Sequence, residues 1–173
     1  MSHPDPIIRE LHVKSNDTFP NSHFPVLLYK RVLDVPAFFA ASKIEKHFIA
    51  NGWTGIVSAP VLAKHAYHSN AHKVLAAIKG QAMILIGGEN GKHVKFEKGD
   101  VLIIPAGVAH KNLSKESDIV CVTAYYGNDK VETLYGDEAK HDLPDMPVPA
   151  ADPFYGENEN GLLHAWKDKY PDK

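Results

Sequence analysis

Histidines are the residues of this chain best suited to chemistry, and one of them closes a distinctive stretch, Gly99–His110. Gly99 predicts a turn, and the apolar residues 101–104 predict a short buried strand. Pro105 has no N–H with which to extend strand pairing, and Gly107 permits backbone angles that other residues avoid. A strand, a tight bend and a histidine in this order would place the His110 imidazole inside a barrel, where it could serve as an acid, a base or a metal ligand.

A second cluster of potential ligands lies upstream, because three of the 11 histidines fall within residues 64–73. They are His65, His68 and His72, and Lys73 follows directly. On a helix the three histidines would share one face, whereas on a strand neighbouring side chains point to opposite faces. Residues 60–80 fit both structures, because the segment is Ala-rich, begins at a proline and ends at a glycine.

The flanking sequence favours strands. Short strands separated by turns are predicted at 82–86, 92–96, 101–104 and 119–126, and this spacing is typical of an all-β sandwich or barrel. Earlier in the chain we expect an edge strand at 7–13, a turn-rich connector at 19–25 and a strand at 26–29. Later, residues 127–150 are expected to wrap over the surface, and the apolar segment 162–166 is expected to dock on the body.

One helix is expected, from Asp34 and Pro36 to Asn51-Gly52. Its apolar residues recur at the spacing of one helical face, which we expect to pack on the barrel exterior or on a partner. These residues are Ala37, Ala41, Ile44 and Phe48.

Length and composition describe an ordinary globular protein of 173 residues, with 44% hydrophobic and 23% charged residues. A net charge of −2 without a Lys/Arg cluster argues against a nucleic-acid partner. No apolar stretch approaches the roughly 20 residues that span a bilayer, so no membrane partner is expected. The N-terminus lacks a signal-peptide pattern, and the single cysteine, Cys121, is predicted to be a packed, inert thiol. We therefore expect a cytoplasmic location.

The spacing Gly-x5-Pro-x-Gly-x2-His at 99–110 resembles the second sequence motif of the cupin superfamily. The first cupin motif, Gly-x5-His-x-His-x3–4-Glu-x6-Gly, supplies two histidines and a glutamate that bind one divalent metal together with the histidine of the second motif. Counting back from Gly80 places Lys73 at the glutamate, His68 at the second histidine and Ala66 at the first. The resemblance therefore implies a barrel pocket formed by Ala66, His68, Lys73 and His110. Of these four residues, only His68 and His110 have side chains that can bind a metal.

Two alternatives follow from this departure. A local bulge could turn His65 or His72 inward to join His68 and His110 around iron, nickel, zinc or manganese, although strand alternation argues against it. Otherwise Lys73 replaces the metal with a fixed positive charge that holds a carboxylate or phosphate. The metal set under the first alternative is His68, His110 and His72, and the candidate catalytic residues are His110 and Lys73.

Beyond the motifs, the whole chain resembles a family of bacterial stand-alone cupins. The stretches that carry this likeness are 24–29, 51–53, 67–75, 87–88, 99–110, 152–156 and Trp166. The resemblance implies one domain over residues 1–173, with a barrel core at about 54–126, N-terminal strands and a helix in 1–53, and a C-terminal extension in 127–173. It also implies a homodimer formed by sharing edge strands, which would cover an exposed sheet edge.

Two functional hypotheses remain open. The chain is either a metal-dependent oxygenase or isomerase that acts on a small metabolite, or a non-catalytic module that binds a small anion through Lys73 and His110. Convergence of three or more ligand atoms on one point would favour the enzyme. A barrel that has lost its activity and serves through its dimer surface would instead have a pocket filled by side chains.

Overall fold

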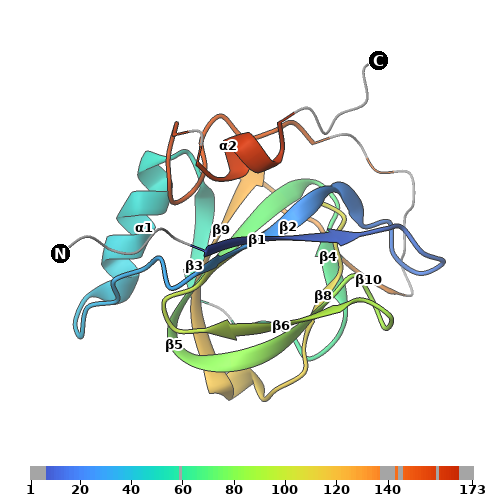
Figure 1. The fold of residues 1–173 in the computed structure, drawn as a ribbon, viewed down its shortest axis with the longest axis horizontal. Helices are drawn as coiled ribbons and strands as arrows, with labels where there is room; N and C mark the ends of the chain where they lie inside the picture. Colours follow the sequence, from blue (N-terminus) through green and yellow to red (C-terminus); the bar gives the residue numbers. More distant parts are fainter. Residues whose placement is uncertain (1–6, 59, 137–142, 144–145, 159, 168–173) are drawn as a thin grey trace.

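The computed structural model describes residues 7–58, 60–136, 143, 146–158 and 160–167, and within them the chain is a barrel of antiparallel strands (Figure 1). The strands are β1 (Ile7–Val13), β2 (Ser22–Lys30), β3 (Thr54–Ser58), β4 (Ala66–His68), β5 (Ala71–Ile86), β6 (Lys92–Glu97), β7 (Val101–Ile104), β8 (His110–Asn112), β9 (Ile119–Gly127) and β10 (Thr133–Tyr135). Two helices, α1 (Ala40–Ala50) and α2 (Leu162–Ala165), and a 3-10 turn at Glu116–Asp118 accompany them. The all-β barrel expected from the sequence is confirmed.

Strand β5 joins the two halves of the barrel. Its first part pairs with β7 and β9, and its second part, from Gln81 onward, pairs with β6 and β8. Gly80 lies at the change of partner with φ 80°, and a Cβ there would lie 1.9 Å from the Asp118 carbonyl oxygen. Only glycine fits this bend, because both the backbone angle and the close approach exclude a side chain.

The same strand explains why residues 71–80 do not form a helix. Leu75 and Ala77 lie in the barrel interior, whereas Val74 and Ala76 belong to a second core on the outer face. A strand buried on both faces reads as a continuous apolar run without strand alternation, so local periodicity could not distinguish it from a helix. The strands expected at 26–29, 82–86, 92–96, 101–104 and 119–126 are all present.

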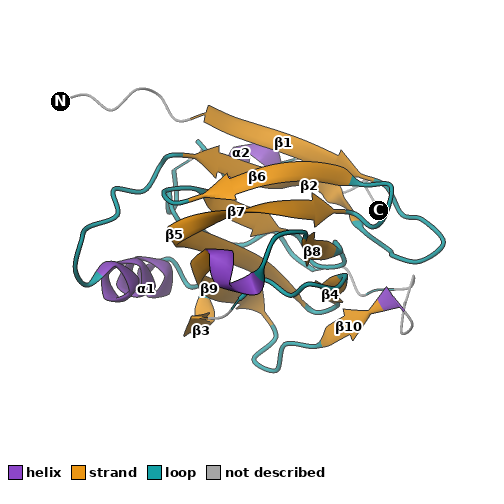
Figure 2. Cartoon of the chain, turned by 90° about the horizontal axis from the view of Figure 1, so that it is seen from below, coloured by secondary structure: helices purple, strands orange, loops and turns teal. Residues whose placement is uncertain are grey.

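The outer core is covered by α1 and the C-terminal extension, which lie together on one side of the barrel (Figures 1 and 2). Ile44 and Phe48 of α1 are buried there, which confirms that the helix packs on the barrel exterior. Trp166 is fully buried, stacks on Phe24 at 4.8 Å and donates its Nε1–H to the Pro25 carbonyl oxygen at 2.9 Å. The expected docking of residues 162–166 is therefore confirmed.

Asp152 fastens this extension. Its buried carboxylate accepts hydrogen bonds from the Tyr29 hydroxyl of β2 and from the backbone N–H groups of Phe154, Tyr155 and Leu162. A side chain that ties two backbone segments of the extension to a barrel strand fixes the path of the chain over the outer face.

Two boundaries differ from the sequence-based expectation. The helix begins at Ala40 rather than near Pro36, because Phe39 adopts a left-handed conformation with φ 60° and Ala37 remains exposed. The connector expected at 19–25 ends at Asn21, and Ser22 to Pro25 already belong to β2. Pro25 is tolerated in β2 because the pairing of β2 with β7 begins only at Leu27.

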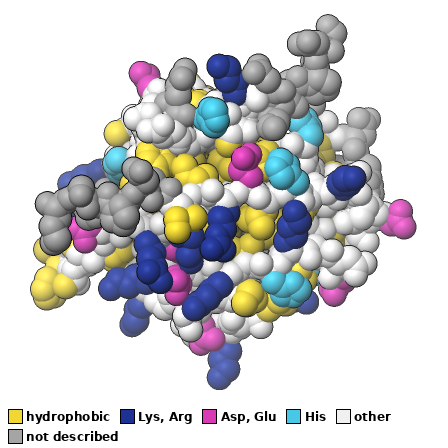
Figure 3. All heavy atoms as spheres, in the orientation of Figure 1, with side chains coloured by type: hydrophobic (Ala, Val, Ile, Leu, Met, Phe, Trp, Pro, Cys, Tyr) yellow, Lys and Arg dark blue, Asp and Glu magenta, His cyan; other side chains and the backbone are white. Residues whose placement is uncertain are grey.

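The surface mixes charges of both signs. On the face shown in Figure 3, basic side chains gather near the centre, with acidic and histidine side chains among them. Among the described residues, no helix has the length and apolar character needed to cross a membrane.

Candidate functional site

The structure brings together three of the four pocket residues expected from the sequence. His68 ends β4, Lys73 lies in β5 and His110 begins β8. The His68 and His110 ring centroids are 5.7 Å apart, and Lys73 Nζ lies 3.3 Å from His110 Nε2. Ala66 pairs directly with His110 across β4 and β8. We refer to Lys73, His68 and His110 as the interior triad.

Hydrogen bonds fix the orientation of both imidazoles. His110 Nδ1 lies 3.1 Å from the Val108 carbonyl oxygen, so this nitrogen carries the proton and Nε2 is free to accept a bond from the Lys73 ammonium. His68 Nδ1 lies 3.1 Å from the Thr133 hydroxyl, which comes from β10. The opposite nitrogen, His68 Nε2, is buried and has no hydrogen-bond partner among the described residues. Such an atom is costly to leave unsatisfied, and it is available to a ligand.

Burial keeps the two histidines neutral. It lowers the pKa of His68 to about 3, with a further lowering from the Lys73 charge. Burial also lowers the pKa of His110 well below its ordinary range, and Lys73 and His68 add to the effect. Near neutral pH, each ring therefore offers one N–H donor and one lone pair.

Lys73 is the sole cationic member of the triad. Burial lowers its pKa from 10.5 to about 8, an effect opposed by the Cys121 thiol, whose own pKa is raised by burial to about 12. None of the described residues places a carboxylate on the ammonium, whose recorded contacts are His110 and the face of the Tyr125 ring at 6.0 Å. Lys73 and Tyr125 nevertheless keep part of their surface accessible to solvent. Within the part of the chain that the structure describes, the barrel thus holds a desolvated positive charge without a carboxylate counter-ion.

The residues present do not fit a metal ion at this position. Among the described residues, no group of three or more His, Cys, Asp or Glu side chains could hold one. The lone pair of His110 Nε2, which would face a metal, accepts a hydrogen bond from Lys73 instead. An ammonium repels a divalent cation and has no lone pair to donate.

His72, predicted as a possible metal ligand, lies on the other side of the sheet and does not converge with His68 and His110. Its Nδ1 accepts the Ala106 N–H at 3.0 Å, and its Nε2 lies 3.0 Å from the Pro147 carbonyl oxygen. Its ring meets Trp166 edge-on at 4.9 Å, in the outer core. Burial lowers the pKa of His72 to about 4. Strand alternation, which places it opposite to Lys73, was the signal that pointed to this outcome.

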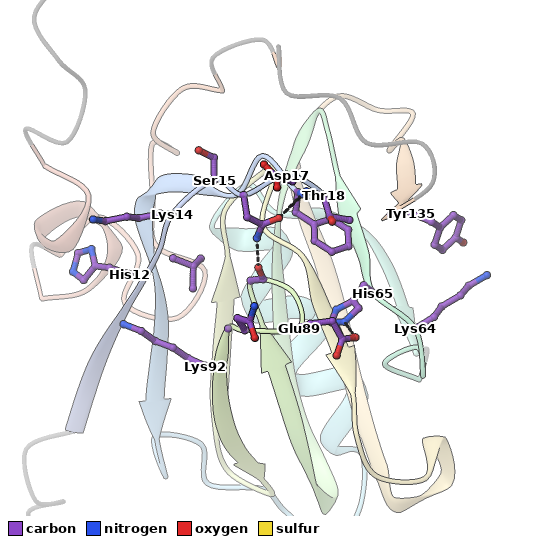
Figure 4. Close-up of a pocket in the computed structure, with 17 residues that line it drawn as sticks. His12, Lys14, Ser15, Asp17, Thr18, Lys64, His65, Glu89, Lys92 and Tyr135 are labelled. Atoms are coloured by element: carbon purple, nitrogen blue, oxygen red, sulfur yellow. Dashed lines mark hydrogen bonds and ion pairs between the residues drawn. The ribbon is translucent and has the colours of Figure 1, made fainter.

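His65 lies at the rim of the barrel, beside an open groove of about 750 Å³ (Figure 4). Its Nε2 lies 2.8 Å from Glu89 Oε1, and its ring packs against Phe19 at 5.4 Å. Figure 4 shows Lys64 and Tyr135 on one side of this pair and His12, Lys14 and Lys92 on the other. The interior triad does not line this groove, so the two features are distinct.

Two residues near the candidate sites were missed by the sequence analysis. Thr133 binds His68 from a segment expected to lack regular structure, and no local signal marks it. Glu89 lies in the turn between β5 and β6, where a charged residue would ordinarily be solvated. Both contacts join segments far apart in the chain, so only the tertiary structure reveals them.

Comparisons with known proteins agree with the fold. The Cupin family model matches residues 62–153. The uncharacterized protein YjlB of Bacillus subtilis (strain 168) is 36% identical over 148 residues, which are 83% of this chain and 86% of that protein.

Solved structures are more distant. Acireductone dioxygenase from Bacillus anthracis, with a cadmium ion in its active centre, is 16% identical with a TM-score of 0.40 over 55% of this chain and 64% of that chain. A mutant of Bacillus subtilis oxalate decarboxylase is 15% identical with a TM-score of 0.33 over 64% of this chain and 23% of that chain. The chain thus spans less than two thirds of either protein, and likenesses at this level carry no functional argument.

Proposed function

The chain belongs to the cupin family, and from this premise we propose that its barrel binds a small anionic molecule at Lys73 and does so without a metal ion. The observation that carries the proposal is the Lys73 ammonium inside the barrel, without a carboxylate partner among the described residues. A buried charge without a counter-ion is costly, and an anion delivered by a ligand removes that cost.

The neighbouring groups suit the same ligand. Among the described residues His68 Nε2 has no hydrogen-bond partner, so a polar group of a ligand can satisfy it. Neither histidine carries a charge near neutral pH, so Lys73 alone supplies the electrostatic attraction. The ring of Tyr125, edge-on to His68 at 5.1 Å, supplies an apolar wall. A carboxylate with a small apolar or carbonyl-bearing body matches this combination.

Ligand binding can be measured by isothermal titration calorimetry with lactate, pyruvate and inorganic phosphate. The test compares wild type with Lys73→Gln and with Lys79→Gln, a control that removes an exposed lysine from the same strand. We expect Lys73→Gln to weaken binding at least about tenfold, equivalent to about 1.4 kcal/mol, and Lys79→Gln to leave it unchanged. Equal binding by all three proteins, or no binding of any of these anions, would contradict the proposal.

The metal-dependent alternative has a separate test. Wild type and His110→Ala are dialysed against iron, nickel, zinc or manganese and analysed by elemental mass spectrometry. Stoichiometric metal in wild type that is lost in His110→Ala would show that Lys73 leaves the site, and it would replace the proposed function with a metalloenzyme. We expect no such difference, because Lys73 occupies the metal-facing nitrogen of His110.

A further inference from the structure

We infer that Lys73 is a nucleophile that forms a Schiff base with a small carbonyl compound, with His110 as the residue that positions its nitrogen. The inference deepens the proposed function and rests on it only in placing the ligand at Lys73. It adds a covalent step that anion binding does not require.

The geometry of the triad carries this inference. Lys73 Nζ lies 3.3 Å from an imidazole nitrogen, His110 Nε2, whose other nitrogen is held by the Val108 carbonyl oxygen. The lone pair of this fixed imidazole therefore holds the Lys73 nitrogen in one position. A lysine held by a carboxylate would be kept charged and unreactive, but Lys73 has no such partner among the described residues. Cys121 and Tyr125 of the neighbouring strand β9 lie on the same face of the sheet as Lys73.

Desolvation supports the same conclusion. The lowered pKa of Lys73, about 8, leaves a substantial fraction of the side chain as the neutral amine near neutral pH. Near pH 7.5 that fraction exceeds the fraction of an ordinary exposed lysine by about 200-fold. Apolar burial of this kind is a recognised way to activate a lysine for attack on carbonyl carbon.

The step balances with water as the carrier of one proton. The Lys73 ammonium gives one proton to water, and the resulting amine attacks the carbonyl carbon. A second proton moves from the nitrogen to the former carbonyl oxygen, giving a carbinolamine. A proton from water then adds to the hydroxyl, which leaves as water, and the carbon–nitrogen double bond forms. One of the three ammonium protons stays on the iminium nitrogen and two depart with water, so the charge is unchanged.

Trapping with pyruvate tests the inference, and lactate is the matched anion without a carbonyl. The full-length protein is incubated with pyruvate and sodium cyanoborohydride, digested, and its modified lysines are identified by peptide mass spectrometry. We expect Lys73 to carry the reduced pyruvyl group at least about tenfold more than the exposed Lys79 and Lys92, because its neutral fraction is larger. The rate should rise as pH increases from about 7 to 9, and His110→Gln should slow it.

Lys73→Arg separates this inference from the proposed function, because arginine keeps the positive charge and cannot form the imine. Retained lactate binding without a pyruvate adduct in Lys73→Arg is the expected result. Lactate binding by wild type without any adduct at Lys73 would overturn the Schiff base and leave the anion site in place. An adduct at Lys73 without lactate binding would overturn the anion site alone. Labelling of Lys73 no greater than that of Lys79 in wild type would refute the inference even if the variants failed to fold.

Discussion

Replacement of Lys73 by methionine should change how the stability of the barrel depends on pH. Methionine has a similar length and no charge, so the substitution removes the buried ammonium and keeps most of the packing. The loss of the hydrogen bond to His110 Nε2 adds an offset that does not vary with pH above 7, because His110 stays neutral there. The informative quantity is therefore the difference in unfolding free energy between wild type and variant as pH rises.

The sign and size follow from the lowered pKa of Lys73. Between its folded value of about 8 and its ordinary value of 10.5, the unfolded chain binds a proton that the folded chain does not. Wild-type stability therefore rises through this window, while the full cost of the charge, about 3 kcal/mol, is present below it. Between pH 7 and pH 10, the unfolding free energy of wild type should therefore increase by about 2.5 kcal/mol relative to that of the variant.

Urea unfolding followed by circular dichroism at several pH values measures this difference. The other titratable groups that face Lys73 are His68, His110, Cys121 and Tyr125. Burial raises the pKa values of Cys121 and Tyr125, which lowers stability at high pH, but both groups are present in wild type and variant and so cancel in the difference. Lys79→Met is the control from the same strand and should show the wild-type pH dependence.

A difference in unfolding free energy that stays constant from pH 7 to pH 10 would refute the reasoning. It would mean that Lys73 is solvated in the folded protein as well as in the unfolded chain. The proposed anion site and the nucleophilic amine both depend on desolvation of this group, so both would lose their physical basis.

Three further predictions concern other parts of the molecule. The imidazole resonances of His68 should not titrate in NMR spectra between pH 5 and 8, since burial lowers its pKa to about 3, and a midpoint near 6.5 would contradict this. Asp152→Asn should lower the free energy of unfolding by roughly 3 kcal/mol, because an amide nitrogen would face backbone N–H donors. The same substitution should speed proteolysis of the C-terminal extension, and an unchanged digestion pattern would contradict this. Gly80→Ala should lower the melting temperature strongly. Gly55→Ala should lower it less, because the nearest atom to the new Cβ lies 3.3 Å away in the Tyr125 ring. Equal losses of melting temperature would show that the clash at Asp118 is not decisive.

Much of the barrel could be predicted from the sequence, because strands and turns leave local patterns. Glycine turns and short apolar runs located the strands from 82 to 126, and the Pro-x-Gly bend placed His110 at the start of β8. The helix boundary was less accurate, because the left-handed backbone of Phe39 has no signature in residue type. The segment 60–80 stayed ambiguous, because a strand with two buried faces loses the alternation that identifies strands.

For the candidate site, the sequence by itself determined which residue types stand at the positions of the two cupin motifs. Strand alternation determined that Lys73 and His72 point to opposite faces of the sheet. Only the tertiary structure decided that Lys73 reaches His110 Nε2, that Thr133 of β10 binds His68, and that Lys73 has no carboxylate partner among the described residues. The physical reason is that these properties depend on distances between strands β4, β5, β8 and β10, and on desolvation by the whole barrel. Neither is encoded in the order of neighbouring residues, whereas the pattern that forms each strand is.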